Sequence, residues 1–169
     1  YETLDISDYE GAKILHDMNE PIPDILYEKY DFIYDGSTMD NVFDPVMFIR
    51  NAAKMLKSGG RILMGNCAGS SPGAYVMLSP QWFYSYFALN DFLDCKVYVS
   101  VARKDKDRFL ISGDLFFWEP FFTPSENYNH IDAIKSTDGL MHAWVLAEKG
   151  QNSTFDKTPM QLHFMDDNS

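Results

Sequence analysis

Polar residues gather in residues 35–41 (DGSTMDN), directly after a short apolar run at residues 30–34. An acid and a glycine immediately after a buried strand, Asp35 and Gly36, are costly unless they serve a turn or a ligand. Carboxylates accept hydrogen bonds and hydroxyls both donate and accept, so this segment suits a polar ligand. Neither a Ser-His-Asp or Cys-His arrangement nor a metal-ligand spacing is visible in the sequence.

Similar polar groups follow three other expected strands. These groups are Asp5-Ile6-Ser7, His16-Asp17-Met18-Asn19 and Gly65-Asn66. In sheets of parallel strands, ligands bind at the carboxyl ends of the strands, which lie at the same edge. We therefore predict that Asp5, Asp17 and Asp35 converge at one edge of a sheet.

Simpler explanations exist for several of these residues. Asp5 and Asp17 could be turn residues that bind nearby backbone amides. His16 is more readily a packed strand residue than a base, and Asp44 is explained as the cap of a helix. The residues alone leave both kinds of role open.

Strands and helices alternate along the chain. Five strands are expected in one sheet, at Tyr1–Ile6, Ala12–Leu15, Tyr30–Tyr34, Arg61–Gly65 and Lys96–Ala102. Two helices begin with a cap followed by proline, at Pro45–Lys57 and Pro80–Leu89, and Gly59-Gly60 is expected to end the first. Further elements are a helical turn within Asp24–Lys29, a hairpin of Phe109–Trp118 with the strand at Asp94–Ala102, and a last strand at Met141–Glu148. The order predicts an α/β domain with a mostly parallel sheet over residues 1–150, followed by a polar, loosely held tail at 151–169.

Composition limits the function. The chain has 169 residues, of which 46% are hydrophobic and 23% charged, so it is long and apolar enough for one core. The net charge of -11 disfavours nucleic acid as a partner. No apolar run approaches the roughly 20 residues that span a bilayer, so no membrane partner is expected. Cys67 and Cys95 form no CxxC pair and are interpreted as reduced core residues of a cytoplasmic protein.

The segments LDIS, ILHDMNEPIP, YDFIYDGSTMDNVFDP and MLKSGGRILM, in this order, resemble the class I S-adenosylmethionine-dependent methyltransferases. The last of them resembles the family's leucine-lysine-proline-Gly-Gly-arginine segment, with Ser58 in place of proline. The closing MHAWVLAEKG resembles the family's final strand. The resemblance covers roughly residues 1–150 and implies a Rossmann-like, doubly wound sheet with an antiparallel C-terminal strand pair.

The resemblance also implies a cofactor site for S-adenosylmethionine. Asp5, with Ile6 beside it, would accept hydrogen bonds from the ribose hydroxyls. Asp17 would accept from the adenine amino group, with the backbone of Met18 near the ring. Asp35 and Gly36 would lie at the methionine end of the cofactor.

The acceptor side is expected around the methyl group. The residues assigned to it are Thr38, Asp40, Asn66 and Tyr84. Tyr84 belongs to a cluster of rings at residues 82–87, most of which are expected in the core. No catalytic base and no metal are assigned.

The sequence departs from the family at its start. The family's first strand and its glycine-rich loop carry the methionine part of the cofactor, and none of the ten glycines here forms a G-x-G motif. The missing strand is central in the family's sheet, between the strands that begin here at Tyr1 and Tyr30. Because the chain starts at Tyr1 in a strand-like run, a piece of a longer polypeptide or a processed product is expected. Without that central strand the sheet must close its gap, be completed by a partner segment, or fail. The expected protein partner is this completing segment or, as an alternative, a second copy in a homo-oligomer.

Two functions remain open from the sequence. The first is a methyltransferase, or a fragment of one, that acts on a small molecule such as a sugar or another metabolite. The second is a methyltransferase-like binding or assembly module that has lost the cofactor loop. A nicotinamide-dependent enzyme is a more remote third reading, since it also requires a glycine fingerprint that is absent.

Overall fold

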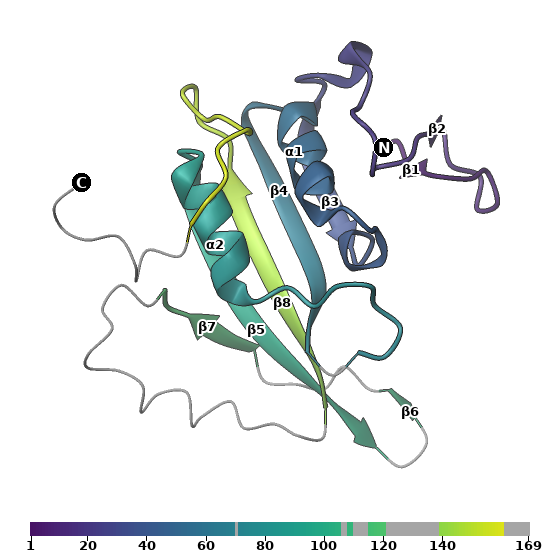
Figure 1. The fold of residues 1–169 in the computed structure, drawn as a ribbon, viewed down its shortest axis with the longest axis vertical. Helices are drawn as coiled ribbons and strands as arrows, with labels where there is room; N and C mark the ends of the chain where they lie inside the picture. The colour runs from purple at the N-terminus through teal and green to yellow at the C-terminus, as the bar shows by residue number, and fades with distance from the viewer. Residues whose placement is uncertain (70, 106–107, 110–114, 121–138, 161–169) are drawn as a thin grey trace, which may run out of the picture.

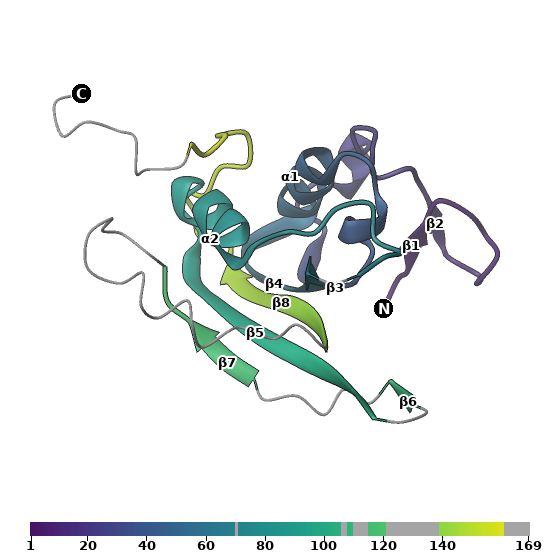
Figure 2. The same cartoon turned by 60° about the horizontal axis from the view of Figure 1, so that its bottom comes forward.

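The computed structural model describes residues 1–69, 71–105, 108–109, 115–120 and 139–160. In these residues a six-stranded sheet carries two α-helices on one of its faces (Figures 1 and 2). The predicted α/β class with a Rossmann-like sheet is confirmed. Since both helices cover the same face, the described residues contain one of the two helical layers of a doubly wound fold.

The central sheet has the strand order β3–β4–β8–β5–β6, and β7 also pairs with β5. The strands are β3 (Tyr30–Gly36), β4 (Leu56–Gly69), β8 (Gly139–Glu148), β5 (Leu93–Asp105), β6 (Arg108–Phe109) and β7 (Leu115–Trp118). β3 and β4 are parallel, and β8 is antiparallel to both β4 and β5. The predicted last strand is therefore confirmed, and so is the antiparallel pairing of the region 108–118 with β5 over its described residues.

Both helices begin where the sequence predicted. The helix α1 (Pro45–Met55) is capped by Asp44, whose Oδ1 accepts from the amide of Met47 at 2.9 Å. The helix α2 (Pro80–Leu89) is capped by Ser79, whose Oγ accepts from the amide of Trp82 at 3.2 Å. A cap residue followed by proline satisfies a free amide and presets the first helical φ angle, which explains the fixed starts. A predicted helical turn is present as the 3-10 helix η1 (Asp24–Leu26).

The predicted end of the first helix is wrong. The helix α1 ends at Met55, and Leu56 already belongs to β4 and pairs with Tyr30 of β3. Leu56 is completely buried, so tertiary packing draws the chain into the sheet before the two glycines are reached. Gly59 has a φ of +81° and donates its amide to the carbonyl of Lys149, which gives it a role inside the strand.

The core lies between the sheet and the two helices. Phe83 and Phe87 of α2 and Ile49 of α1 are fully buried and belong to one hydrophobic core. Burial of such side chains stabilises a fold by about 1.5–3 kcal/mol each. The prediction that most rings of residues 82–87 are core is confirmed, because Tyr86 is buried as well.

The prediction of one continuous sheet is wrong. The strands β1 (Leu4–Asp5) and β2 (Ile14–Leu15) form a separate parallel pair. Among the described residues, no strand pairs with the other edge of β3, which we call the open edge of β3. The physical reason is the missing central strand: without it, neither β1 nor β3 has a neighbour to hydrogen-bond across the gap.

Side chains connect the strand pair to the sheet. Glu2 accepts from the hydroxyl of Tyr30 at 2.8 Å and forms a 2.9 Å ion pair with Lys29. On β3 itself, Phe32 and Tyr34 are 55% and 60% exposed, although a strand so close to a core normally buries its large side chains. The open edge of β3 and these rings form an incompletely covered surface.

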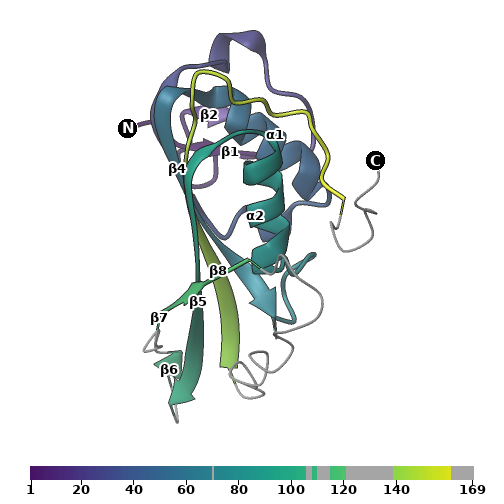
Figure 3. The ribbon, with the colours of Figure 1, turned by 90° about the vertical axis from the view of Figure 1, so that its left-hand side faces the viewer.

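The segment after β8 packs against α2 in its described part, which contradicts the expected loose tail for residues 151–160. Asn90, at the end of α2, accepts from Thr154 and Lys157 and donates to the carbonyl of Lys157. The hydroxyl of Tyr86 donates to the carbonyl of Phe155 at 2.9 Å. Figure 3 shows this segment passing from β8 over the ends of the helices. The rest of the predicted tail, 161–169, lies outside the described residues.

Candidate functional site

The loop after β3 is built around a buried carboxylate. Asp35 is at the end of β3, beside Met64 of the parallel strand β4, and is only 4% exposed. Its Oδ2 accepts from the amide of Asn66 at 2.7 Å, and its Oδ1 accepts from the backbone amide of Thr38 at 2.8 Å. Burial raises the pKa of the Asp35 carboxyl, and the bonds from Asn66 and Thr38 oppose that rise. Both oxygens are engaged in fixing the loop.

Asp40 is a second buried carboxylate that accepts hydrogen bonds in the same loop. It lies in the short 3-10 helix η2 (Met39–Asn41) and is completely buried. Its Oδ2 accepts from the hydroxyl of Ser37 at 2.8 Å and from the amide of Cys67 at 2.7 Å. Its own amide donates to Oδ1 of Asn66 at 3.1 Å. Asp40 and Asn66 therefore tie the loop to β4, and their assignment as substrate contacts stays a prediction.

Part of this loop is exposed to solvent. Gly36 and Thr38 are exposed at the end of β3. Ser37 between them has a φ of +75°, which costs an L-residue of this type about 1–2 kcal/mol. The buried bonds of Asp35 and Asp40 hold this conformation in place. Strain that the surroundings maintain is frequent where a loop receives a ligand.

The first strand pair contributes two carboxylates at its carboxyl ends. Asp5 is half-buried, and its Oδ1 accepts from the amide of Ser7 at 2.9 Å. Its carbonyl accepts from the amide of His16, which places the ends of β1 and β2 next to each other. The other carboxylate oxygen of Asp5 has no partner among the described residues. Ile6, beside it, is 68% exposed.

Asp17 has the same arrangement. Its Oδ1 accepts from the backbone amide and the side-chain amide of Asn19, at 2.9 Å and 2.8 Å. These bonds lower the pKa of Asp17, so the carboxylate is ionised at neutral pH. Its Oδ2 also lacks a partner within the described part of the chain. Met18, next in the chain, is buried, and its carbonyl accepts from the side chain of Asn51.

Two asparagines that the sequence interpretation did not assign hold this loop against α1. The Oδ1 of Asn19 accepts from the amides of Phe43 and Asp44, at 3.0 Å and 2.9 Å. Asn51 of α1 is completely buried; it donates to the carbonyls of Met18 and Glu20 and accepts from the amide of Ile22.

These bonds connect the loop after β2 with the loop after β3. The sequence signal for this role is the polar residue Asn51 beside the apolar face of α1. In sequence such a position resembles a surface position, so the role was not recognised. Hydrogen bonds thus connect Asp5 with the loop that contains Asp17, and that loop with the start of α1.

Tyr84, the remaining predicted site residue, is half-buried on α2. Its ring lies 6.0 Å from the ring of Trp118 on β7, at an interplanar angle of 59°. This places Tyr84 toward β7, while the loop of Asp35 lies at the other side of the sheet order. Its role in an acceptor site stays a prediction.

No group of three or more His, Cys, Asp or Glu side chains in the described ranges could hold a metal ion. None of the helices that the structure describes has the length and apolar character to cross a membrane.

No protein-family model and no curated protein matches the chain. Solved structures do match it. A methyltransferase from Archaeoglobus fulgidus that depends on S-adenosylmethionine (SAM) has a TM-score of 0.54 and 11% identity, over 86% of this chain and 74% of that one. The YcgJ protein from Bacillus subtilis has a TM-score of 0.53 and 14% identity, over 84% and 74% of the two chains.

A third structure comes from Thermotoga maritima and is described as a SAM-dependent methyltransferase, possible histamine N-methyltransferase. It has a TM-score of 0.52 and 17% identity, over 85% of this chain and 68% of that one. The chain therefore has the fold of the class I SAM-dependent methyltransferases, and the resemblance read from the sequence is confirmed at the level of the fold. Identities this low establish the fold and leave the activity to argument from the site.

Proposed function

We propose that this chain is the larger part of a SAM-dependent methyltransferase that acts on a small molecule. The observation that carries the proposal is the pair Asp5 and Asp17. Each carboxylate binds its own loop with one oxygen and has no described partner at the other. Both stand at the carboxyl ends of neighbouring parallel strands in a chain with this fold, where such folds bind ligands.

The residues fit the parts of the cofactor as follows. Asp5 accepts from the ribose hydroxyls, with Ile6 covering the sugar. Asp17 accepts from the adenine amino group, and the backbone of Met18 borders the ring. Asp35 uses both carboxylate oxygens within the loop, so the exposed backbone at Gly36 is the part that approaches the methionine end.

When bound, SAM supplies an electrophilic methyl group on a sulfonium. The chain's own contribution is alignment of the acceptor and exclusion of water, which can account for most of the rate in such transfers. Thr38, in the loop after β3, is the residue we assign to acceptor contact. Asp40 and Asn66, being buried, support the loop that presents Thr38.

The methionine part of the cofactor requires more than these residues offer. We propose that a further polypeptide segment pairs with the open edge of β3 and carries the glycine-rich loop. The backbone groups of β3 that no described strand pairs support this proposal, because they form an edge that can accept a strand. The exposed rings of Phe32 and Tyr34 lie on a face of the sheet beside this edge and are free for a further segment to cover. The segment either precedes Tyr1 in a longer polypeptide or comes from another chain.

A labelled-methyl assay tests the proposed activity. The polypeptide that includes the completing segment is incubated with methyl-labelled SAM and a pool of small metabolites. Label in a small molecule that depends on the protein supports the proposal. If SAM binds without any transfer, or does not bind, the chain is a binding or assembly module instead.

A further inference from the structure

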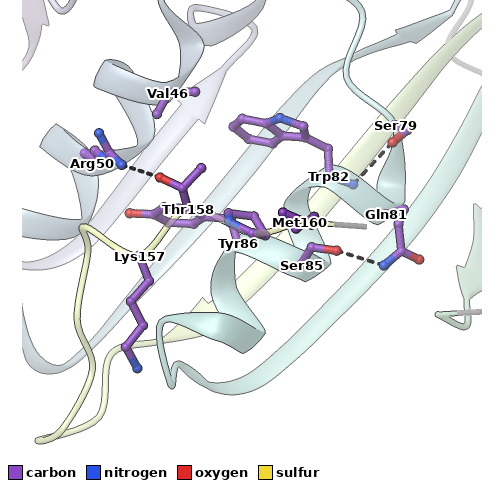
Figure 4. Close-up of a pocket in the computed structure, with 11 residues that line it drawn as sticks. Val46, Arg50, Ser79, Gln81, Trp82, Ser85, Tyr86, Lys157, Thr158 and Met160 are labelled. Atoms are coloured by element: carbon purple, nitrogen blue, oxygen red, sulfur yellow. Dashed lines mark hydrogen bonds between the residues drawn. The ribbon is translucent and has the colours of Figure 1, made fainter. Parts of the chain in front are cut away.

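A cavity lies away from all residues assigned to the cofactor and the acceptor. It has a volume of about 310 Å³ and is lined by α1, α2 and the segment 157–160 (Figure 4). Ligand pockets begin at about this size. None of the predicted cofactor or acceptor residues lines it. The cavity is therefore independent of the proposed methyl-transfer site.

The cavity contains an arginine with unused hydrogen-bonding capacity. One guanidinium nitrogen of Arg50, Nη2, donates to the carbonyl of Asp156 at 3.0 Å and to the hydroxyl of Thr158 at 2.8 Å. Its Nη1 donates to no described residue. Its Nε is also unpaired but completely buried, so a ligand in the cavity would meet Nη1 and not Nε. Among the described residues, no carboxylate lies within ion-pairing distance of Arg50. A half-buried positive charge with an unpaired donor is unfavourable, so the cavity favours a ligand that brings an acceptor and a negative charge.

The opposite wall of the cavity is aromatic. Trp82 and Tyr86 lie one turn apart on α2, with ring centroids 6.4 Å apart and an interplanar angle of only 12°. Both residues line the cavity; Tyr86 is buried and Trp82 is half-buried. Val46 and Met160 add apolar surface. A flat ring placed here would stack on Trp82 and replace water at an apolar wall.

We propose that this cavity binds a small aromatic carboxylate, with the carboxylate at Arg50 and the ring against Trp82. Arginine suits this ligand because its planar fork of donors matches the two oxygens of a carboxylate. The volume limits the ligand to about the size of one ring with its acid group. Lys157 also lines the cavity, but it forms a 2.7 Å ion pair with Asp91. Arg50 is therefore the cation of the described lining that has no ion-pair partner.

Benzoate is the probe for the test, and benzamide is its neutral counterpart of the same shape. The protein has three tryptophans, so the indole N–H signals in a nitrogen–proton correlation spectrum are few, and Trp82→Phe assigns the one of interest. We expect benzoate to shift the Trp82 signal with a dissociation constant of about 1 mM, since a ligand of this size binds weakly. Benzamide should shift it at least about tenfold more weakly, because it lacks the charge.

Variants separate the roles of charge and space. Arg50→Gln should weaken benzoate at least about tenfold, whereas Arg61→Gln, at an exposed arginine on β4, should leave it unchanged. Val46→Phe keeps Arg50 but fills the cavity, so it should abolish the shift even if Arg50→Gln fails to fold. The proposal is overturned if benzoate does not shift Trp82 in the wild-type protein, if benzamide binds equally well, or if Trp118 or Trp144 responds in its place. SAM binding, measured separately, is not expected to change in any of these variants.

Discussion

Replacing Asn51 with alanine should destabilise the fold through the loop after β2. The variant removes the partner of the carbonyl of Met18 and of the amide of Ile22, and both residues are at least nine-tenths buried. The third bond, to the carbonyl of Glu20, ends at an exposed residue where water can replace it. Two buried groups without partners cost about 1–3 kcal/mol each. Alanine regains about 0.6 kcal/mol of helix propensity, so the expected net loss is about 1.5–5 kcal/mol.

Urea unfolding followed by circular dichroism measures this loss at constant slope. Asn152→Ala is the matched control, because Asn152 is exposed and should change stability by less than about 0.5 kcal/mol. Hydrogen exchange should also show faster exchange of the amides near Ile22 in the Asn51 variant. A free energy of unfolding within 0.5 kcal/mol of wild type would refute the reasoning that Asn51 holds this loop.

Three further predictions concern the interior. The raised pKa of Asp35 means that its ionised form destabilises the fold. Lowering the pH through the folded-state pKa toward the unfolded value of 3.8 should therefore raise the stability of wild type relative to Asp35→Asn; a difference that stays constant or falls over this window in urea titrations would contradict this. Burial raises the pKa of Cys95 to about 12 and also raises the pKa of Cys67. Iodoacetamide should therefore alkylate both thiols slowly at pH 7.5 in the folded protein and much faster in urea. Rapid labelling of the folded protein would contradict this, because it would show that the thiols are accessible thiolates. Gly65→Ala would drive a methyl group into the Trp144 ring and should cost about 1–3 kcal/mol or more, whereas Gly73→Ala meets nothing within 4 Å and should be near neutral; equal melting temperatures of the two variants would refute this packing.

Short sequence patterns predicted several helix and strand positions. The starts of both helices were predictable, because Asp44-Pro45 and Ser79-Pro80 encode their geometry within two residues. The end of α1 was not, since the burial of Leu56 and its pairing with Tyr30 depend on residues far apart in sequence. Gly59 and Gly60 therefore indicated a break after the helix, but they did not show at which residue the helix ends.

The positions of the three carboxylates near strand ends were predictable, but the residues that hold their loops in place were not. Asp5, Asp17 and Asp35 stood out because each follows a strand. Sequence could not show that Asp35 spends both oxygens inside the loop, or that Asn51 binds the chain more than thirty residues away. Such contacts depend on how the loop after β2 packs on α1, which has no local pattern.

The arrangement of the strands shows the same limit. The absence of a first strand was visible as a missing glycine motif. Its consequence, a split into a strand pair and a separate sheet, required the hydrogen-bond pairing itself. The alternation of strands and helices predicts a sheet but does not reveal whether every neighbour in that sheet is present.

The most direct test of the account is a calorimetric titration with SAM of the polypeptide that includes the completing segment. Wild type should bind, and Asp5→Ala should weaken binding about 10- to 150-fold, which corresponds to the loss of a charge-assisted contact of about 1.5–3 kcal/mol. Asp8→Ala is the control, because the Asp8 side chain is exposed on the same loop and has no assigned role. Equal binding by wild type and Asp5→Ala, or no binding by wild type, would contradict the proposed cofactor site.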